Sequence, residues 1–198
     1  MMKRHASTVR GQMRPLTSPQ VAATETILAQ EGDWRSVALF RTAIDTMLRA
    51  SDLVALILSD VMGADGQVME EIIVRQIKTG GTVRGVLSPA TREAVKRWLL
   101  VRPPFWGPWL FTGKIQGEHL SVSQYRRETK RWLGKVGLDT RFYSTHSLRR
   151  TKAALIYAKT GNIEAVRRLL GHATVSATSR YLGVEDADAL KLARDIRI

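Results

Sequence analysis

Apolar side chains recur every three or four residues along much of this chain, a spacing typical of amphipathic helices. Residues 34–48 show it most clearly, because Val37, Phe40 and Ile44 recur at that spacing behind Asp33, a residue type that caps helix starts. Prolines, glycines and small polar residues mark the ends of the other apolar-patterned segments. Helices are therefore also predicted over residues 17–30, 88–101, 122–136, 145–159, 163–170, 175–181 and 186–196.

A change of pattern in the first half of the chain predicts strands. Residues 68–78 and 82–87 are rich in Val and Ile, and the Thr79-Gly80-Gly81 segment between them is typical of a hairpin turn. Residues 53–61 form an apolar run that we interpret as a short helix passing into a strand. The predicted fold class is α+β, mostly helical, with one small antiparallel sheet in the N-terminal half.

Composition narrows the range of partners. The chain has 198 residues, 44% of them hydrophobic, which is enough for one packed domain. Lysine and arginine total 31 against 18 acids, a net charge of +13, so a polyanion is the expected partner, nucleic acid before an anionic membrane. The chain has no cysteine, which excludes disulfides and thiolate chemistry. With neither a signal-like N-terminus nor an apolar run of about 20 residues, the expected location is cytoplasmic and nucleoid-associated.

The positive charge is unevenly distributed. Residues 1–16 carry four Lys/Arg and no acid, so they are interpreted as a basic arm, although a plain disordered terminus explains them equally well. Residues 17–198 are interpreted as one domain. Between Arg126 and Lys152 there are nine Lys/Arg and two acids. The candidate DNA-binding residues in that segment are Arg126, Arg127, Lys130, Arg131, Arg150 and Lys152.

Two motifs in the second half carry candidate chemistry. His146 and Arg149 stand three residues apart, so on a helix they share a face and can grip one phosphate together. A tyrosine, Tyr181, follows His172 by nine residues and is a usable nucleophile where a base takes its proton and cations stabilise the phenolate. Taken singly, the first motif is more often a solvated polar face and the tyrosine more often a packed side chain.

Two further motifs lie upstream. Arg49 and Asp52 stand three residues apart at a helix junction, which is also the spacing of an ordinary local salt bridge. Lys78 lies at the predicted hairpin turn, where a lysine is commonly just solvated. In chain order the motifs are R-x-S-D-L, K-T-G, H-x-L-R and L-G-H, followed by the tyrosine. This series, over about residues 16–184, resembles the catalytic domain of the tyrosine recombinases, the phage-integrase family.

The resemblance implies roles for the polar residues that hold the phosphate. Arg49 and Arg149 would bind the non-bridging oxygens of the scissile phosphate, and His172 would hydrogen-bond the phosphoryl group. Asp52 would brace the site at the family's acidic position, where glutamate is commoner. These cations would stabilise the transition state.

The resemblance also implies the reacting groups. Tyr181 would attack the phosphorus and form a 3′-phosphotyrosine, Lys78 would protonate the departing 5′ oxygen, and His146 would act as acid or base. The covalent link stores the phosphodiester energy, so neither a metal nor another cofactor is implied. The implied function is site-specific DNA recombination, and inversion, excision and integration are equally compatible with it. Two alternatives remain, a DNA-binding regulator that keeps the fold and, less favoured, a type IB topoisomerase-like relaxing enzyme.

Organisation and partners follow from the same resemblance. Most family members carry a separate core-binding domain before the first arginine, and the residues before Arg49 are too few for one. The chain is therefore similar to short single-domain members such as the fimbrial phase-variation invertases. Expected partners are duplex DNA with paired half-sites, further copies of the protein forming dimers to tetramers on DNA, and accessory DNA-bending proteins. The predicted helix 186–196 would dock on a neighbouring copy or on its own domain.

Overall fold

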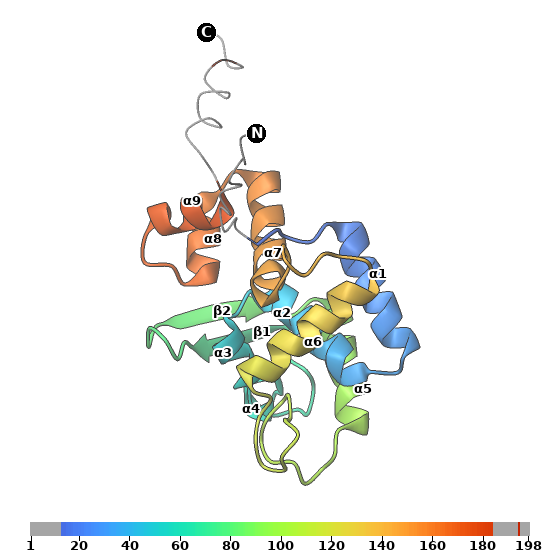
Figure 1. The fold of residues 1–198 in the computed structure, drawn as a ribbon. Coiled ribbons are helices and arrows are strands. Elements are labelled where there is room, and N and C mark those ends of the chain that lie inside the picture. The colour runs from blue at the N-terminus through green and yellow to red at the C-terminus, as the bar shows by residue number, and fades with distance from the viewer. Residues whose placement is uncertain (1–12, 184–193, 195–198) are drawn as a thin grey trace.

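A computed structural model describes residues 13–183 and residue 194. Within these residues the chain forms helices around a single two-stranded sheet, and Figure 1 shows the arrangement. The mostly helical α+β prediction is confirmed. In chain order the elements are α1 Ser18–Gln30, α2 Trp34–Thr46, α3 Ala50–Val54, α4 Leu58–Val61, β1 Glu71–Arg75, β2 Thr82–Val86, α5 Pro89–Val101, α6 Val122–Lys135, α7 Thr145–Thr160, α8 Ile163–Leu170 and α9 Val175–Leu182.

Helix α2 is the centre of the core. It contacts α1, α5, α7 and β2, and Leu39 and Phe40 are fully buried. The rings of Phe40 and of Trp132, from α6, meet in a T-shaped arrangement at a centroid distance of 6.2 Å. The helix begins where the Asp33 side chain accepts a hydrogen bond from the backbone N–H of Ser36 (3.1 Å). A helix packed on several sides gives the surrounding elements a rigid base.

The sheet is a hairpin with strict alternation. Strands β1 and β2 pair antiparallel, with Val74 opposite Val83. Ile72, Val74 and Val83 face the core, and Gln76 continues the inward alternation one position beyond β1 with 2% of its surface exposed. The turn that follows carries Lys78 to an exposed position.

Two predicted elements differ from the structure. The run 53–61 contains the end of α3 and all of α4, and it contains no strand, because Ile57 makes only an isolated bridge to Trp109. Leu53, Val54 and Leu56 are all buried, so the apolar pattern there has no period that distinguishes helix from strand. The first strand is also shorter than predicted, because Val68 belongs to a separate bridge with Met62.

The ends of the chain are described only in part. At the end of the predicted basic arm, Leu16 is buried and its backbone N–H donates to the hydroxyl of Thr151 in α7 (3.0 Å). The rest of that arm, residues 1–12, and the predicted helix 186–196, apart from residue 194, lie outside the described residues. In the part of the chain that is described, no helix combines the length and apolarity needed to cross a membrane.

Candidate active site

A pocket of about 460 Å³ lies between the β1–β2 turn and the segment joining α8 to α9. Three of the predicted catalytic residues line it, namely Arg49, Lys78 and His172. A larger cavity of about 630 Å³ lies between α1, α2 and α7, and none of the predicted catalytic residues lines it. The charged side chains that line the larger cavity are engaged in two ion pairs, Arg41–Glu25 and Lys152–Asp45. The smaller pocket is therefore the candidate site, since the charged side chains that line it are predicted catalytic residues.

Arg49 stands at the junction of α2 and α3. Helix α2 ends at Thr46, because the left-handed backbone of Met47 (φ 52°) stops the helix, and Arg49 is the N-cap residue of α3. Its side chain is half-buried, and its Nη1 is buried without a hydrogen-bond acceptor among the described residues. A buried charged donor without an acceptor is costly, so Arg49 is prepared to bind an anion.

Asp52 connects α3 to the lysine-bearing turn. Its side chain is buried (2% exposed), and its Oδ1 accepts a hydrogen bond from the backbone N–H of Ile77 at 2.9 Å. The next residue along the chain is Lys78, which is exposed at the pocket. The carboxylate therefore fixes the backbone that carries the ammonium group.

Arg149 is the buried arginine of α7. Its Nη2 donates to the carbonyl oxygen of Leu170 at the end of α8 (2.9 Å), and its Nη1 is buried with no acceptor in the described part of the chain. Burial lowers the pKa of Arg149, although an arginine stays charged at any physiological pH. Arg149 is thus a second charged donor that is not yet satisfied, and its charge acts on His172, which lines the pocket.

His146 lies one helical turn before Arg149 and is exposed. Ser144 caps α7 by accepting from the backbone N–H of His146 (3.2 Å), which fixes the first turn. Partial burial and the charges of Arg149 and Arg126 lower the pKa of His146 below its ordinary value. The lowered pKa favours the neutral imidazole, which is able to accept a proton.

Gly171 brings the next histidine against the sheet. Its φ of +62° favours glycine, and a Cβ at this position would come within 2.5 Å of Val83 Cγ1 and 2.8 Å of Gln76 Nε2. His172 follows directly and lines the pocket. The L-G-H motif therefore has a steric cause, because only glycine lets the end of α8 approach β2 this closely.

A short chain of hydrogen bonds orients His172. The hydroxyl of Thr178 donates to the carbonyl oxygen of Thr174 (3.2 Å), and Nδ1 of His172 lies 3.1 Å from that hydroxyl oxygen. Since the hydroxyl proton is already used, Nδ1 carries a hydrogen and Nε2 carries a lone pair in the neutral ring. Burial, with the charges of Arg149 and Arg49, lowers the pKa of His172 to about 4. Neutral His172 accepts a hydrogen bond at Nε2, and donation to a phosphoryl oxygen requires a second proton.

Tyr181 lies on α9, with its hydroxyl buried and without a hydrogen bond that satisfies normal geometry among the described residues. Its ring meets the His172 ring edge-on at 5.2 Å between centroids, and the Arg150 guanidinium carbon lies 5.4 Å from the tyrosine ring centroid. Burial raises the pKa of Tyr181 to about 12, against the opposing charges of Arg149, Arg150 and Arg49. The phenol is therefore held un-ionised among three cations.

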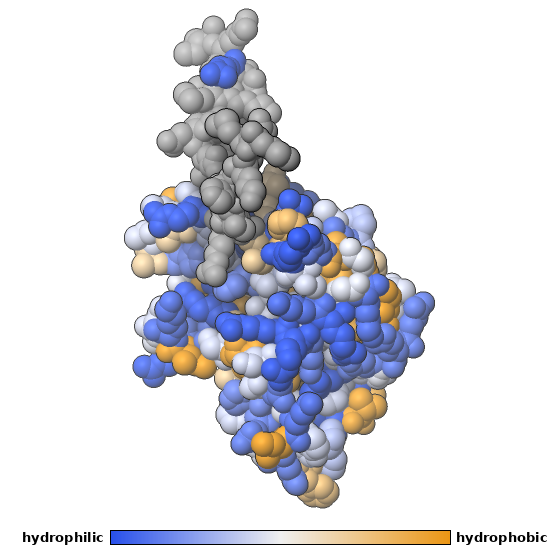
Figure 2. Space-filling model, in the orientation of Figure 1, coloured by the Kyte–Doolittle hydropathy of each residue, from blue (hydrophilic) through white to orange (hydrophobic). Residues whose placement is uncertain are grey.

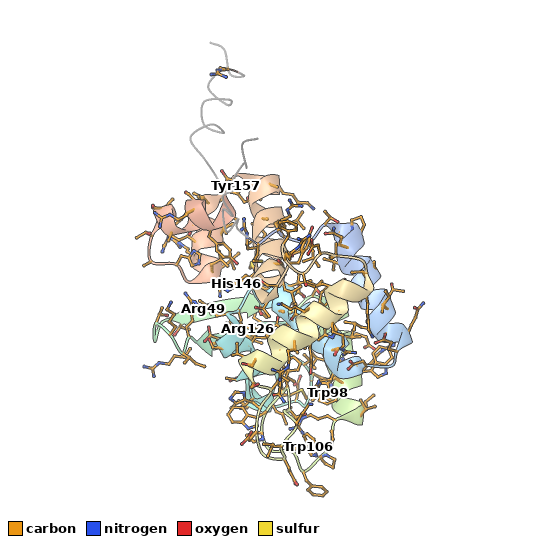
Figure 3. All side chains as sticks on the ribbon, viewed as in Figure 1. Arg49, Trp98, Trp106, Arg126, His146 and Tyr157 are labelled. Atoms are coloured by element: carbon orange, nitrogen blue, oxygen red, sulfur yellow. The ribbon has the colours of Figure 1, made fainter. Side chains whose placement is uncertain are left out.

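The structure brings the predicted catalytic residues together from separate parts of the chain. Arg49 and Arg149 act electrostatically on both His172 and Tyr181, Arg149 acts on His146, and Lys78 shares the pocket with Arg49 and His172. Figure 3 shows Arg49, His146 and Arg126 near the meeting point of α3, α6 and α7. Among the described residues no group of three His, Cys, Asp or Glu is placed to hold a metal ion.

The predicted DNA-binding residues divide into two groups. Arg126, Arg127 and Lys130 are exposed on α6, whose surroundings form a mostly hydrophilic face in Figure 2. The other three make contacts within the protein. Arg131 pairs with Asp33 (3.2 Å) and Lys152 with Asp45 (2.8 Å), while Arg150 is buried against Tyr181; each has a partner within the protein.

Two residues at the site were not predicted from the sequence. Gln76 lies between the turn and the end of α8, where its Oε1 accepts from the Thr79 hydroxyl (2.8 Å) and its Nε2 lies 3.4 Å from the Leu170 carbonyl oxygen. The inward alternation of β1, extended by one step, is the signal that would have identified it. Thr178 is fully buried beside His172, and its spacing of six residues from the histidine gives no such signal.

Comparison with known proteins identifies relatives of this chain. The model of the phage integrase family matches residues 16–188. Tyrosine recombinase XerC of Rhodospirillum centenum is 32% identical over 186 residues, which cover 87% of this chain and 52% of the relative. Thus the chain spans about half the length of that curated relative.

Two solved structures share the fold. The crystal structure of XerA recombinase superposes with a TM-score of 0.76 at 22% identity, covering 95% of this chain and 66% of the other. XerH site-specific recombinase, bound to a palindromic difH substrate in a post-cleavage complex, gives 0.74 at 19% identity, covering 95% and 54%. The family model covers most of the sequence and both structures share its architecture, so the chain belongs to the phage integrase family.

Proposed function

We propose that this chain cleaves and rejoins DNA strands at specific sites through a 3′-phosphotyrosine formed by Tyr181. One observation carries the proposal. The buried tyrosine hydroxyl lies among arginines, and two of these, Arg49 and Arg149, each have a buried Nη1 without an acceptor in the described part of the chain. A phosphate diester is an anion whose two non-bridging oxygens can accept hydrogen bonds from both donors. Its phosphorus would then lie beside the tyrosine nucleophile.

Cleavage on this proposal is an in-line displacement at phosphorus. The Tyr181 oxygen forms a bond to the phosphorus as the bond to the 5′ oxygen breaks. Arg49 and Arg149 hold the non-bridging oxygens, where negative charge grows in the transition state. Because the new aryl ester retains the phosphodiester energy, attack by a free 5′ hydroxyl reverses the step and joins the strands.

Two protons move during cleavage. The phenol proton goes to a neutral imidazole, and both His146 and His172 qualify, since the pKa of each lies below its ordinary value. The departing 5′ oxygen takes a proton from Lys78, whose turn is fixed by Asp52. In rejoining, the histidine returns a proton to the tyrosine oxygen and Lys78 takes the proton of the 5′ hydroxyl.

Duplex DNA is the proposed partner, held over α6. Three exposed cations lie there, namely Arg126, Arg127 and Lys130. The charge of Arg126 acts on His146, so this surface is next to the candidate active site. Among the compared structures, XerH is described on a palindromic substrate. By analogy we propose paired half-sites and self-association on DNA, from dimer to tetramer, with inversion, excision and integration as the possible outcomes. Accessory DNA-bending proteins are further proposed partners.

A suicide substrate tests the proposal directly. A duplex nicked next to the cleavage position loses its short 5′-hydroxyl fragment after attack, so the covalent protein–DNA product accumulates. The candidate sites come from selecting bound sequences out of a random duplex pool. Wild-type protein should give a denaturant-resistant product, and Tyr181→Phe should give none while binding DNA within a few-fold of wild type.

The alternatives make different predictions in the same assay. A regulator that only binds DNA would give no covalent product with any bound site, and that result would refute the proposal. A topoisomerase-like enzyme would relax supercoiled plasmids that lack the selected site. Covalent product that persists in Tyr181→Phe would assign the nucleophile to another residue.

A further inference from the structure

Arg150 is a buried cation with an unusual environment. Only 6% of its surface is exposed, and its Nε is buried without an acceptor among the described residues. No carboxylate in the described part of the chain pairs with it. A buried guanidinium is ordinarily held by an acid, because desolvating an unpaired charge is costly. Here the contact made by the guanidinium is with the Tyr181 ring, 5.4 Å from its centroid.

Arg149 and Arg150 diverge because successive residues on a helix point about 100° apart. Arg149 reaches the Leu170 carbonyl at the end of α8, and Arg150 reaches α9. Both charges act on the Tyr181 hydroxyl in the direction that favours its ionised form. Each of these arginines has a buried donor without an acceptor among the described residues, so the contact with the tyrosine ring is what distinguishes Arg150 from its neighbour.

We propose that Arg150 is a positioning residue for Tyr181. Arg150 holds the tyrosine ring by a cation–π contact, and its charge stabilises the negative charge that develops on the tyrosine oxygen. This inference rests on the proposed function. In cleavage the phenol proton leaves to a neutral histidine as the new O–P bond forms and the 5′ oxygen departs with a proton from Lys78. In rejoining, the tyrosine oxygen is the leaving group. Arg150 therefore aids both directions and does not touch the phosphate.

The size of the effect follows from the contact. A desolvated cation–π contact together with one nearby charge accounts for roughly a ten- to hundred-fold change in rate. Arg150→Met keeps the length of the stem and removes the charge, so it should slow covalent attachment and rejoining by that factor. Arg150→Lys retains a cation over the ring and should recover part of the loss. DNA affinity should stay within a few-fold in both variants.

A substrate that bypasses the tyrosine separates positioning from a general structural role. DNA ending in a 3′-(4-nitrophenyl) phosphate carries its own aryl leaving group, which departs without help. Tyr181→Phe should join this end to a 5′-hydroxyl strand and release nitrophenolate, which is followed by its absorbance. In that background, adding Arg150→Met should leave the joining rate unchanged, whereas adding Arg149→Met should still reduce it strongly.

The outcomes are distinct. If Arg150→Met slows nitrophenyl joining as much as it slows rejoining from Tyr181, Arg150 acts on the phosphate or the fold and the inference is refuted. Unchanged cleavage by Arg150→Met in the wild-type background also refutes it. Should Arg150→Met fail to fold by circular dichroism, Arg150→Gln replaces it in the same comparison. Absence of both covalent product and nitrophenyl joining in proteins with Arg150 intact would instead overturn the proposed function.

Discussion

The carboxylate of Asp52 accepts a hydrogen bond from the backbone N–H of Ile77 at 2.9 Å, and this contact ties α3 to the turn that carries Lys78. The two residues are far apart in sequence, and the carboxylate is buried. Arg49 is the N-cap residue of the same short helix, so Arg49 and Lys78 are held by one small unit. The acid therefore acts on the geometry of the site without facing the substrate.

Replacing Asp52 should therefore impair the step that depends on Lys78. Asp52→Ala leaves the Ile77 N–H without its acceptor, which should cost about 1–3 kcal/mol of unfolding free energy. Asp52→Asn keeps a carbonyl acceptor and should retain more stability and more cleavage. Cleavage rates and urea unfolding of both variants measure this. Equal cleavage rates for the alanine and asparagine variants would argue against a role for the hydrogen bond.

Lys78→Ala should lose cleavage on ordinary DNA and regain it on DNA whose 5′-bridging oxygen is replaced by sulfur. A thiolate leaves without a proton, so the general acid is no longer needed. The rate of covalent attachment on matched oxygen and sulfur substrates measures the rescue. Arg149→Ala is the control, since it acts on the non-bridging oxygens and should stay impaired on both. A Lys78→Ala defect of the same size on both substrates would assign this lysine another role.

The local features of the site were predictable from sequence, and the contacts between segments were not. The helix that carries H-x-L-R and the hairpin that carries Lys78 follow from periodicity and turn residues, which act over a few positions. The contacts of Arg150 with Tyr181 and of Gln76 with Leu170 join segments far apart in the chain. Nothing in the local pattern around Arg150 distinguishes a buried cation from an exposed one.

Gly171→Ala should disturb the site through both backbone and packing. The positive φ disfavours a side chain, and the new Cβ would meet a Val83 methyl group whose β-branched side chain has little freedom to move. The expected loss is about 1–3 kcal/mol of unfolding free energy, with cleavage reduced further because His172 moves. Chemical denaturation and cleavage rate measure the two effects. Gly134→Ala, where nothing lies within 4 Å of the added Cβ, is the matched control.

His172 should titrate at low pH in the free protein. Its pKa of about 4 lies below the ordinary 6.5, so as pH falls through that interval the unfolded chain takes up a proton before the folded one does. The contribution of His172 to the free energy of unfolding is therefore fully present above pH 6.5 and declines as the pH falls toward 4. Binding of uncleaved DNA by Tyr181→Phe should raise this pKa, because the phosphate charge favours imidazolium.

Proton NMR of the His172 ring, assigned by comparison with His172→Gln, follows the titration in free and DNA-bound protein. A midpoint near 6.5 in the free protein would contradict the described environment. An unchanged midpoint on binding DNA would place the phosphate away from this ring.

Salt dependence should separate the cations that face DNA from those engaged within the protein. Each phosphate contact releases counterions, so loss of one should reduce the slope of log affinity against log salt by about 0.9. Arg126→Gln, Arg127→Gln and Lys130→Gln replace exposed cations on α6 and should each lower the slope. Lys152→Gln should leave the slope unchanged and lower the stability, because its ammonium is paired with Asp45. Fluorescence anisotropy at several salt concentrations, beside thermal unfolding, distinguishes the two groups. A reduced slope in Lys152→Gln, or an unchanged one in all three α6 variants, would move the DNA interface away from α6.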